Sequence, residues 1–162
     1  MQVFVILQLL ILLMLANGTP VIAKKLLGDR YSYPLDGNLT FADGRPLFGH
    51  SKTIRGVVLA VLVTTAGAPL IGLGWKTGFL VGSFAMAGDL VSSFSKRRLN
   101  LPSSSRASGL DQVPESLFPL LACRNLLSLA AADIAVCVVM FFVGEVVLSR
   151  LLYALHLRDR PY

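Results

Sequence analysis

Acidic and basic side chains meet where an apolar stretch of the chain gives way to a polar one. A run of apolar and small residues ends around Asp89, and Lys96, Arg97 and Arg98 follow within a short distance. On a helix, Asp89, Ser93 and Lys96 are spaced i, i+4 and i+7 and therefore share one face. Carboxylates suit Mg²⁺, and clustered Lys and Arg suit phosphates. The spacing predicts metal and phosphate chemistry at a membrane–water boundary.

The same basic cluster has a simpler interpretation as a topology anchor. Lys and Arg often follow a membrane helix on its cytoplasmic side for that reason alone. An anchor, however, needs no acid deeper in the helix, where a charge is costly. Asp111 offers a second hard oxygen ligand on the same side. We therefore favour a site in which Asp89 and Asp111 serve the metal.

The composition indicates a membrane protein. Of the 162 residues, 54% are hydrophobic and only 15% are charged. A net charge of +6 on such a chain points to anionic lipid and phosphate partners rather than to nucleic acid. Cys123 and Cys137 both lie in apolar segments, where thiols usually behave as small hydrophobic side chains rather than as disulfides or metal ligands.

Apolar runs of about 20 residues predict membrane-spanning helices. We expect an all-α integral membrane protein with a single catalytic domain over 1–162 and about five transmembrane helices. The spans are expected at about 1–23, 54–73, 77–95, 114–132 and 134–156, with polar loops at 24–53 and 96–113.

The distribution of cations predicts the orientation. Nothing basic precedes the first apolar run and Lys24-Lys25 follow it, which favours a retained helix over a signal peptide. Nearly all Lys and Arg fall on or toward one side of the predicted spans, and Lys76 lies on the other. The positive-inside rule then predicts a multi-pass protein of the cell membrane. Its N-terminus would be outside, and both long loops and the active site would face the cytoplasm.

The first polar loop is rich in Gly, Pro and Asp. Gly49 allows a close backbone approach to phosphates, and Lys52 and Arg55 supply positive charge. A Walker A loop is excluded, because His50 stands where that motif needs Lys and no strand precedes it.

Five motifs in order resemble the CDP-archaeol synthase family. They are Asp43-Gly44-Arg45, Phe48-Gly49-x-Ser51-Lys52-Thr53-x-Arg55-Gly56, Gly88-Asp89-Leu90, Ser93-Phe94-x-Lys96-Arg97-Arg98 and Leu110-Asp111-Gln112. That family is similar to the broader CTP:phosphatidate cytidylyltransferases. The resemblance implies a membrane enzyme that uses CTP and Mg²⁺ to convert a lipid phosphate to a CDP-lipid, with release of pyrophosphate. The His-Gly-Gly run of the broader enzymes is absent, and His50 replaces an expected small or acidic residue.

The motifs and the resemblance together give the candidate site. Asp89 and Asp111 would hold Mg²⁺, and Lys96 and Arg97 would contact the triphosphate as the other catalytic residues. Further substrate contacts are expected from Asn17, Asp43, Gly49, Ser51, Lys52, Thr53, Arg55, Gly56, Ser93, Arg98 and Gln112.

Two other functions fit part of the pattern. A CDP-alcohol phosphotransferase also works at this boundary, but its motif continues from Asp-Gly to Ala-Arg, which Asp43-Gly44-Arg45 does not. A small membrane scaffold or transporter subunit explains the cations but leaves Asp89 and Asp111 without a role.

Two charges within the last apolar segments predict a contact. Arg124 and Glu145 are placed at matching depth on the two predicted helices 114–132 and 134–156. Because a lone charge near the bilayer midplane is costly, we expect a structural Arg124–Glu145 ion pair. The alternative is a short or bent fourth helix that lets Arg124 extend outward while Glu145 stays protonated.

Overall fold

The computed structural model describes residues 1–102 and 109–154, with side chains described up to residue 150. Five helices follow one another: α1 (Val3–Leu27), α2 (Ile54–Leu70), α3 (Trp75–Arg98), α4 (Gln112–Cys123) and α5 (Ala131–Ala154). The described residues contain no strand beyond two isolated bridges. The predicted all-α architecture is confirmed. Residues 103–108 of the predicted polar loop 96–113 and the last two residues of the predicted span 134–156 lie outside the described residues.

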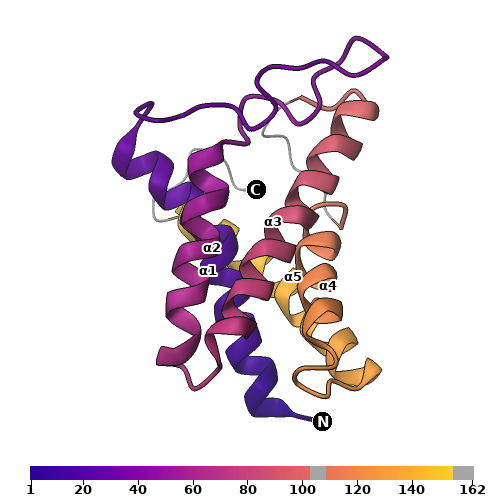
Figure 1. Ribbon diagram of the computed structural model, residues 1–162. Helices are drawn as coiled ribbons and strands as arrows, with labels where there is room; N and C mark the ends of the chain where they lie inside the picture. The colour runs from indigo at the N-terminus through magenta and orange to yellow at the C-terminus, as the bar shows by residue number, and fades with distance from the viewer. Residues whose placement is uncertain (103–108, 155–162) are drawn as a thin grey trace.

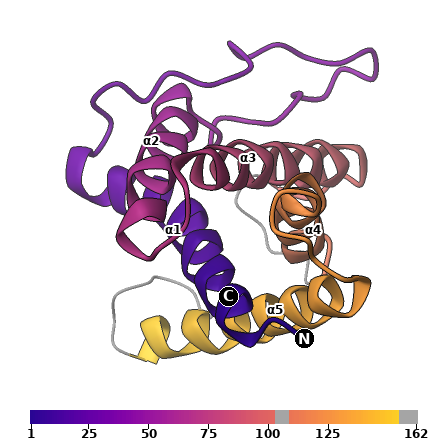
Figure 2. The same cartoon turned by 60° about the horizontal axis from the view of Figure 1, so that its bottom comes forward.

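The helices run up and down between two ends of the bundle (Figure 1). One end carries residues 28–53 and 99–111, and we call it the loop end. The other end carries the N-terminus and the short α2–α3 connection. In the order of the chain each helix packs against the next, and α5 packs back against α1 (Figure 2). This closed circuit brings the two loop segments together over the end of α3.

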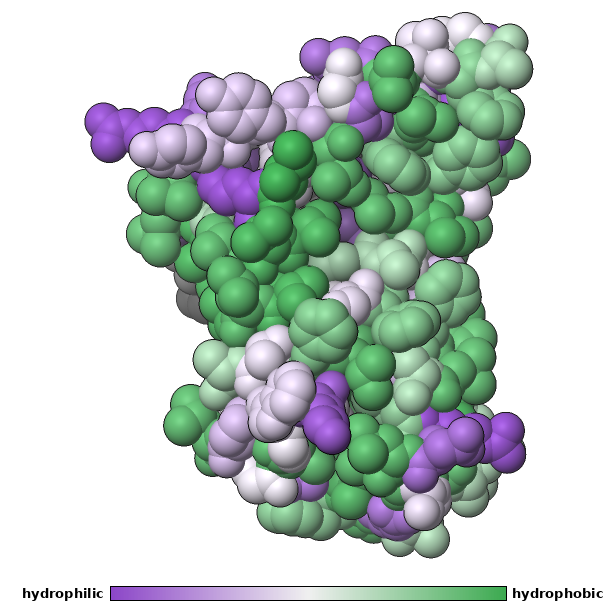
Figure 3. Space-filling model, viewed as in Figure 1, coloured by the Kyte–Doolittle hydropathy of each residue, from purple (hydrophilic) through white to green (hydrophobic). Residues whose placement is uncertain are grey.

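Length and hydropathy place the bundle in a membrane. Val3–Leu27, Trp75–Arg98 and Ala131–Arg150 are long and apolar enough to cross a bilayer, and α2 is a shorter apolar helix. Figure 3 shows a hydrophobic belt between hydrophilic ends. Inside the bundle, the core joins apolar side chains of all helices, with Leu12 and Leu13 of α1 and Phe141 of α5 almost fully buried. Cys123 and Cys137 belong to this core and are not disulfide-bonded.

Small residues let α3 approach its neighbours closely. Added Cβ atoms on Gly78 and Gly82 would overlap Thr64 of α2, as expected from their four-residue spacing. Gly88 does the same toward α4, because its Cβ would overlap the carbonyl group of Pro114. Close contact at Gly88 sets the α3–α4 distance immediately beside Asp89.

Helix α4 is shorter than the sequence predicts. It has 12 residues and ends at Cys123, which is roughly 18 Å and less than the hydrocarbon thickness. The apolar run over 114–132 therefore includes a helix and a turn, which composition alone does not separate. Asp133 closes that turn by accepting hydrogen bonds from the backbone nitrogens of Ala130 at 3.1 Å and Gln2 at 3.0 Å.

The predicted Arg124–Glu145 contact is wrong. Arg124 is the exposed C-cap of α4 at the end of the bundle away from the loops. Glu145 lies 14 positions beyond the start of α5 at Ala131, roughly 21 Å along the helix axis. It is instead close enough to Glu115 to interact with it electrostatically. The prediction failed because it placed Arg124 inside a helix that ends one residue earlier.

Replacement of Gly88 by Ala tests the α3–α4 contact. The added methyl group overlaps backbone atoms of Pro114, which a side-chain rotation cannot relieve. We expect Gly88→Ala to lower the midpoint of thermal unfolding in detergent, by the several degrees typical of overpacking. Gly144→Ala is the matched control, because nothing lies within 4 Å of its Cβ position. Equal midpoints for both variants would contradict the close contact.

Candidate functional site

A buried ion pair joins the first loop to α3. The ammonium nitrogen of Lys52 lies 2.5 and 2.6 Å from the two carboxylate oxygens of Asp89. The two side chains are 23% and 18% exposed. Lys52 is carried by the loop just before Thr53, the N-cap of α2, whose side chain accepts a hydrogen bond from Gly56 N at 3.2 Å. The cap fixes where the loop ends and so where Lys52 meets α3.

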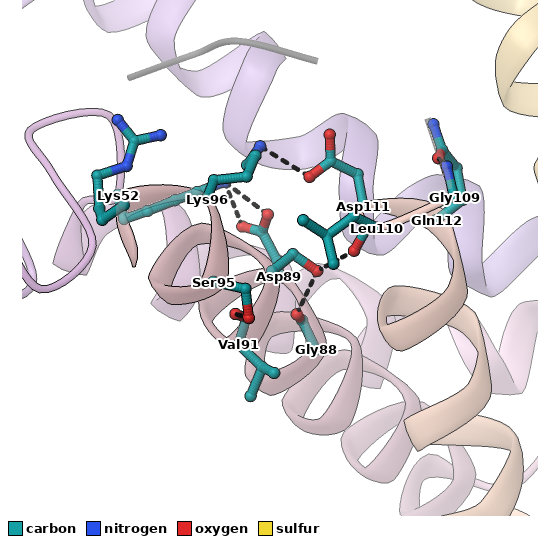
Figure 4. Close-up of polar contacts among 12 residues, drawn as sticks. Lys52, Gly88, Asp89, Val91, Ser95, Lys96, Gly109, Leu110, Asp111 and Gln112 are labelled. Atoms are coloured by element: carbon teal, nitrogen blue, oxygen red, sulfur yellow. Dashed lines mark hydrogen bonds and ion pairs between the residues drawn. The ribbon is translucent and has the colours of Figure 1, made fainter. Parts of the chain in front are cut away.

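A second ion pair joins α3 to the start of α4. Lys96 Nζ lies 2.7 Å from Asp111 Oδ1, and the two side chains are 8% and 15% exposed. Figure 4 shows Lys96 and Asp111 facing one another with the Asp89 carboxylate beside them. Asp89 and Lys96 are two turns apart on one helix, as the sequence predicts, but each is paired with a residue of a different segment.

The hydroxyl group of Ser92 connects the backbone at the two acids. Ser92 Oγ lies 2.9 Å from the carbonyl oxygen of Gly88 and 2.7 Å from that of Leu110. These carbonyl groups directly precede Asp89 and Asp111. Sequence reasoning selected the neighbouring Ser93, which is also buried, and no sequence signal distinguished Ser92.

Glu115 is a further acid that the sequence analysis missed. It lies one helical turn after Asp111, is 7% exposed, and forms a side-chain hydrogen bond with Asp89. The close approach at Gly88 brings Glu115 there, since an added Cβ on that glycine would lie 2.8 Å from Glu115 N. A Glu in a partly apolar segment looked like an isolated charge until the packing of α3 on α4 was known.

Arginines fasten the first loop to the end of α3. Arg98 Nη1 lies 2.8 Å from Asp43 Oδ1, and its guanidinium group is 5.0 Å from the ring centre of Phe41 and 4.8 Å from that of Phe94. From the loop, Arg45 donates a 2.6 Å hydrogen bond to the backbone carbonyl oxygen of Arg98. Asp43 and Arg98 are thus engaged with one another, and their roles in substrate binding stay predictions.

Asp36 organises the turn of the first loop. Its carboxylate accepts hydrogen bonds from the backbone nitrogens of Phe48 and Gly49, both at 3.0 Å, and of Asn38 at 3.1 Å. Burial alone would raise the pKa of Asp36, but these hydrogen bonds outweigh it and hold the pKa below its usual value. Gly49 adopts a φ of 89°, which favours glycine. Asp36 was missed because a local Asp-Gly pair reads as an ordinary turn.

Other predicted residues serve local structure. Arg55 donates hydrogen bonds to the carbonyl groups of Gly28 and Arg30, which ties the end of α1 to the start of α2. Gln112 accepts a hydrogen bond from Gly109 N at 2.9 Å. Asn17 donates to the carbonyl group of Leu13 within α1 at 3.2 Å and lines neither pocket at the loop end. Contacts of these three residues with substrate stay predictions.

Two pockets lie at the loop end, and the Lys52–Asp89 pair lines one of them. The inner pocket has a volume of about 440 Å³ and lies between α1, α2 and α3. Its lining includes Pro20, Lys24, Ser51, Lys52, Thr53, Arg55, Gly56, Met86 and Asp89. The outer pocket, about 410 Å³, lies between the two loop segments and is lined by residues that include Asp36, Gly49, Arg97 and Pro102. His50 lines both, and Arg97 donates a 2.9 Å hydrogen bond to Pro102 O.

The carboxylates are suited to a metal ion that takes some of its ligands from the protein and the others from a substrate. Among the described residues, no three His, Cys, Asp or Glu side chains form a group that could hold a metal alone. Asp89 and Asp111 offer two carboxylates, both mostly buried and next to lysines. Mg²⁺ is commonly bound through one or two carboxylates, with waters and substrate phosphates completing its shell.

Comparisons with known proteins identify the family of this chain. The family model described as CarS-like, CDP-archaeol synthase, matches residues 66–162. The CDP-archaeol synthase of Sulfurisphaera tokodaii is 35% identical over 155 residues, covering 92% of this chain and 90% of its own. That of Pyrococcus furiosus is 43% identical over 107 residues, which cover 60% of each chain.

A solved structure shares the fold. It is that of an intramembrane enzyme for archaeal membrane lipids biosynthesis, with a TM-score of 0.74 and 26% sequence identity, covering 86% of this chain and 89% of the other. A five-helix bundle with apolar spans and a charged site at one end defines the class: an integral membrane transferase of lipid biosynthesis. Within that class, the chain belongs to the CDP-archaeol synthase family.

Proposed function

We propose that this protein transfers the cytidylyl group of CTP to a lipid phosphate in the bilayer, forming a CDP-lipid and pyrophosphate. The observation that supports it most is the pairing of Lys52 with Asp89 and of Lys96 with Asp111 at one end of a membrane bundle. The lysines would bind phosphates and the carboxylates would bind Mg²⁺, at an end of the bundle where lipid meets water.

The lipid is proposed to carry archaeol-type chains, because the relatives are named CDP-archaeol synthases. An acyl-chain lipid phosphate such as phosphatidic acid is the alternative substrate. Both present the same phosphate to the site, so the residues at the loop end do not separate them.

The reaction needs little covalent chemistry from the protein. An oxygen of the lipid phosphate, already ionised near neutral pH, attacks the α-phosphorus of CTP, and a new P–O bond forms. The bond between the α-phosphorus and the bridging oxygen breaks, and pyrophosphate leaves with the bond electrons. No general base is required for this displacement.

The charged side chains position the reactants and stabilise negative charge. Asp89 and Asp111 would hold Mg²⁺, which when bound would offset the negative charge of the triphosphate and of the leaving pyrophosphate. Lys52 and Lys96 start as partners of these carboxylates, so they are already aimed at the place where phosphates would bind. Arg97, in the outer pocket, would add charge to the triphosphate from the loop side.

The loop end is proposed to face the cytoplasm, where CTP is available. The excess of Lys and Arg at that end supports this orientation. Cysteines placed singly at Asn38 and Trp75, in a background without Cys123 and Cys137, test it with a membrane-impermeant thiol reagent. We expect intact cells to be labelled at position 75 and not at position 38. The reverse pattern would contradict the orientation.

Substitution of the two acids tests the reaction. With purified protein, CTP, Mg²⁺ and an archaeol-type lipid phosphate, we expect wild type to release pyrophosphate. Asp89→Asn and Asp111→Asn should each lower the turnover rate by about two to three orders of magnitude, because each loses a carboxylate that would hold the Mg²⁺ that stabilises the transition state.

Asp133→Asn is the matched control for the two acid substitutions. Asp133 is a buried acid at the opposite end of the bundle, and Asn also accepts capping hydrogen bonds. Near wild-type turnover in both Asp89→Asn and Asp111→Asn would rule out the metal assignment. CMP release from added CDP-lipid without CTP turnover would favour a phosphotransferase.

A further inference from the structure

The inner pocket is graded from apolar to charged along the helix axes. Pro20, Val57 and Met86 line it from α1, α2 and α3. Each lies about one helical turn deeper in the bundle than a charged or polar lining residue. Pro20 lies below Lys24 on α1, Val57 lies below the α2 cap Thr53, and Met86 lies below Asp89 on α3. A pocket with an apolar floor between membrane helices and cations at its rim matches the boundary of an amphiphile, where a phosphate joins an apolar body.

Two cations of this pocket are already engaged. Both Asp89 oxygens lie within 2.6 Å of Lys52 Nζ. The guanidinium group of Arg55 donates to the backbone carbonyl groups of Gly28 and Arg30. Arg55 therefore holds the α1–α2 junction, and its contribution to an incoming phosphate is limited by those bonds.

Lys24 is the third cation of the inner pocket. It is exposed on the last turn of α1. In the described part of the chain, its ammonium group makes no hydrogen bond or ion pair. Lys24 lines the inner pocket from the last turn of α1, whereas Arg97 lines the outer pocket between the loop segments.

The ordinary explanation for Lys24 is that it caps α1. A cation in the last turn of a helix interacts favourably with the helix dipole and anchors the helix at the membrane surface. Lys25 occupies the same turn, is equally exposed, and serves both purposes, but it lines neither pocket. Lys25 therefore shows what an anchoring role alone requires, and only Lys24 is also placed to contact a ligand in the pocket.

We propose that Lys24 binds the phosphate group of the lipid substrate at the lipid-side rim of the inner pocket. This inference rests on the proposed function. It assigns the lipid phosphate to the side of the site made by α1 and α2, and CTP to the side made by the loops, so that the two substrates meet at Asp89. Lys24 acts there as a substrate-binding residue that lies outside the five sequence motifs.

The test compares Lys24→Ala with Lys25→Ala in the full-length protein. Lipid phosphate is varied at saturating CTP, and CTP is varied at saturating lipid phosphate. Lys24→Ala should raise the KM for lipid phosphate about tenfold or more, as expected for loss of a charge-assisted hydrogen bond, and leave the KM for CTP within about twofold. Lys24→Arg should keep most of the affinity, and Lys25→Ala should behave as wild type. Equal effects of the two alanine variants, or an effect of Lys24→Ala on CTP alone, would overturn the proposal.

A binding measurement separates this inference from the reaction itself. Thermal stabilisation of the detergent-solubilised protein by dioctanoyl phosphatidic acid should be weaker in Lys24→Ala than in Lys25→Ala, and dioctanoylglycerol should stabilise both equally. This result would support the inference even if wild type showed no CTP turnover, which would refute only the proposed function. If inorganic phosphate at the same concentration gave the same Lys24-dependent stabilisation, the residue would bind a free anion and the lipid assignment would be wrong.

Discussion

Two ion pairs with α3 hold the loop end of this protein together. Lys52 reaches Asp89 from the first loop, and Asp111 reaches Lys96 from the start of α4. All four side chains are mostly buried, and a charge left unpaired in such a position is costly. The pairs therefore fix both loop segments against one helix. The Ser92 contact and the close packing at Gly88 lie beside these pairs.

The same four side chains are suited to exchange partners when substrate arrives. Without substrate, Asp89 and Asp111 are each paired with a lysine. With Mg²⁺ and a triphosphate, the carboxylates would turn to the metal and the lysines to phosphate oxygens. Preformed positions of this kind reduce the reorganisation that catalysis needs. Asp36 and Arg98 hold the loop that carries Lys52.

The sequence predicted those parts of the structure that depend on segment length, charge and helical spacing. The helices α1 to α3 and the positions of Asp89 and Lys96 follow from apolar runs and the helical period. The end of α4 did not, because an apolar turn and an apolar helix have the same composition. Glu115 and Ser92 could not be found either, since their roles arise only where α3 and α4 meet.

The central claim is that the Lys52–Asp89 pair is both a structural contact and a binding site whose two members have different ligands. The charge-swapped variant Lys52→Asp/Asp89→Lys tests it most directly, by equilibrium binding of labelled CTP with and without Mg²⁺, alongside thermal unfolding. The swap should recover much of the stability lost in the single variants. Its Mg²⁺-dependent affinity for CTP should stay about a hundredfold or more below wild type, because the metal would meet a lysine and the phosphates a carboxylate. Wild-type CTP affinity in the swapped protein would contradict the account and reduce the pair to a structural ion pair.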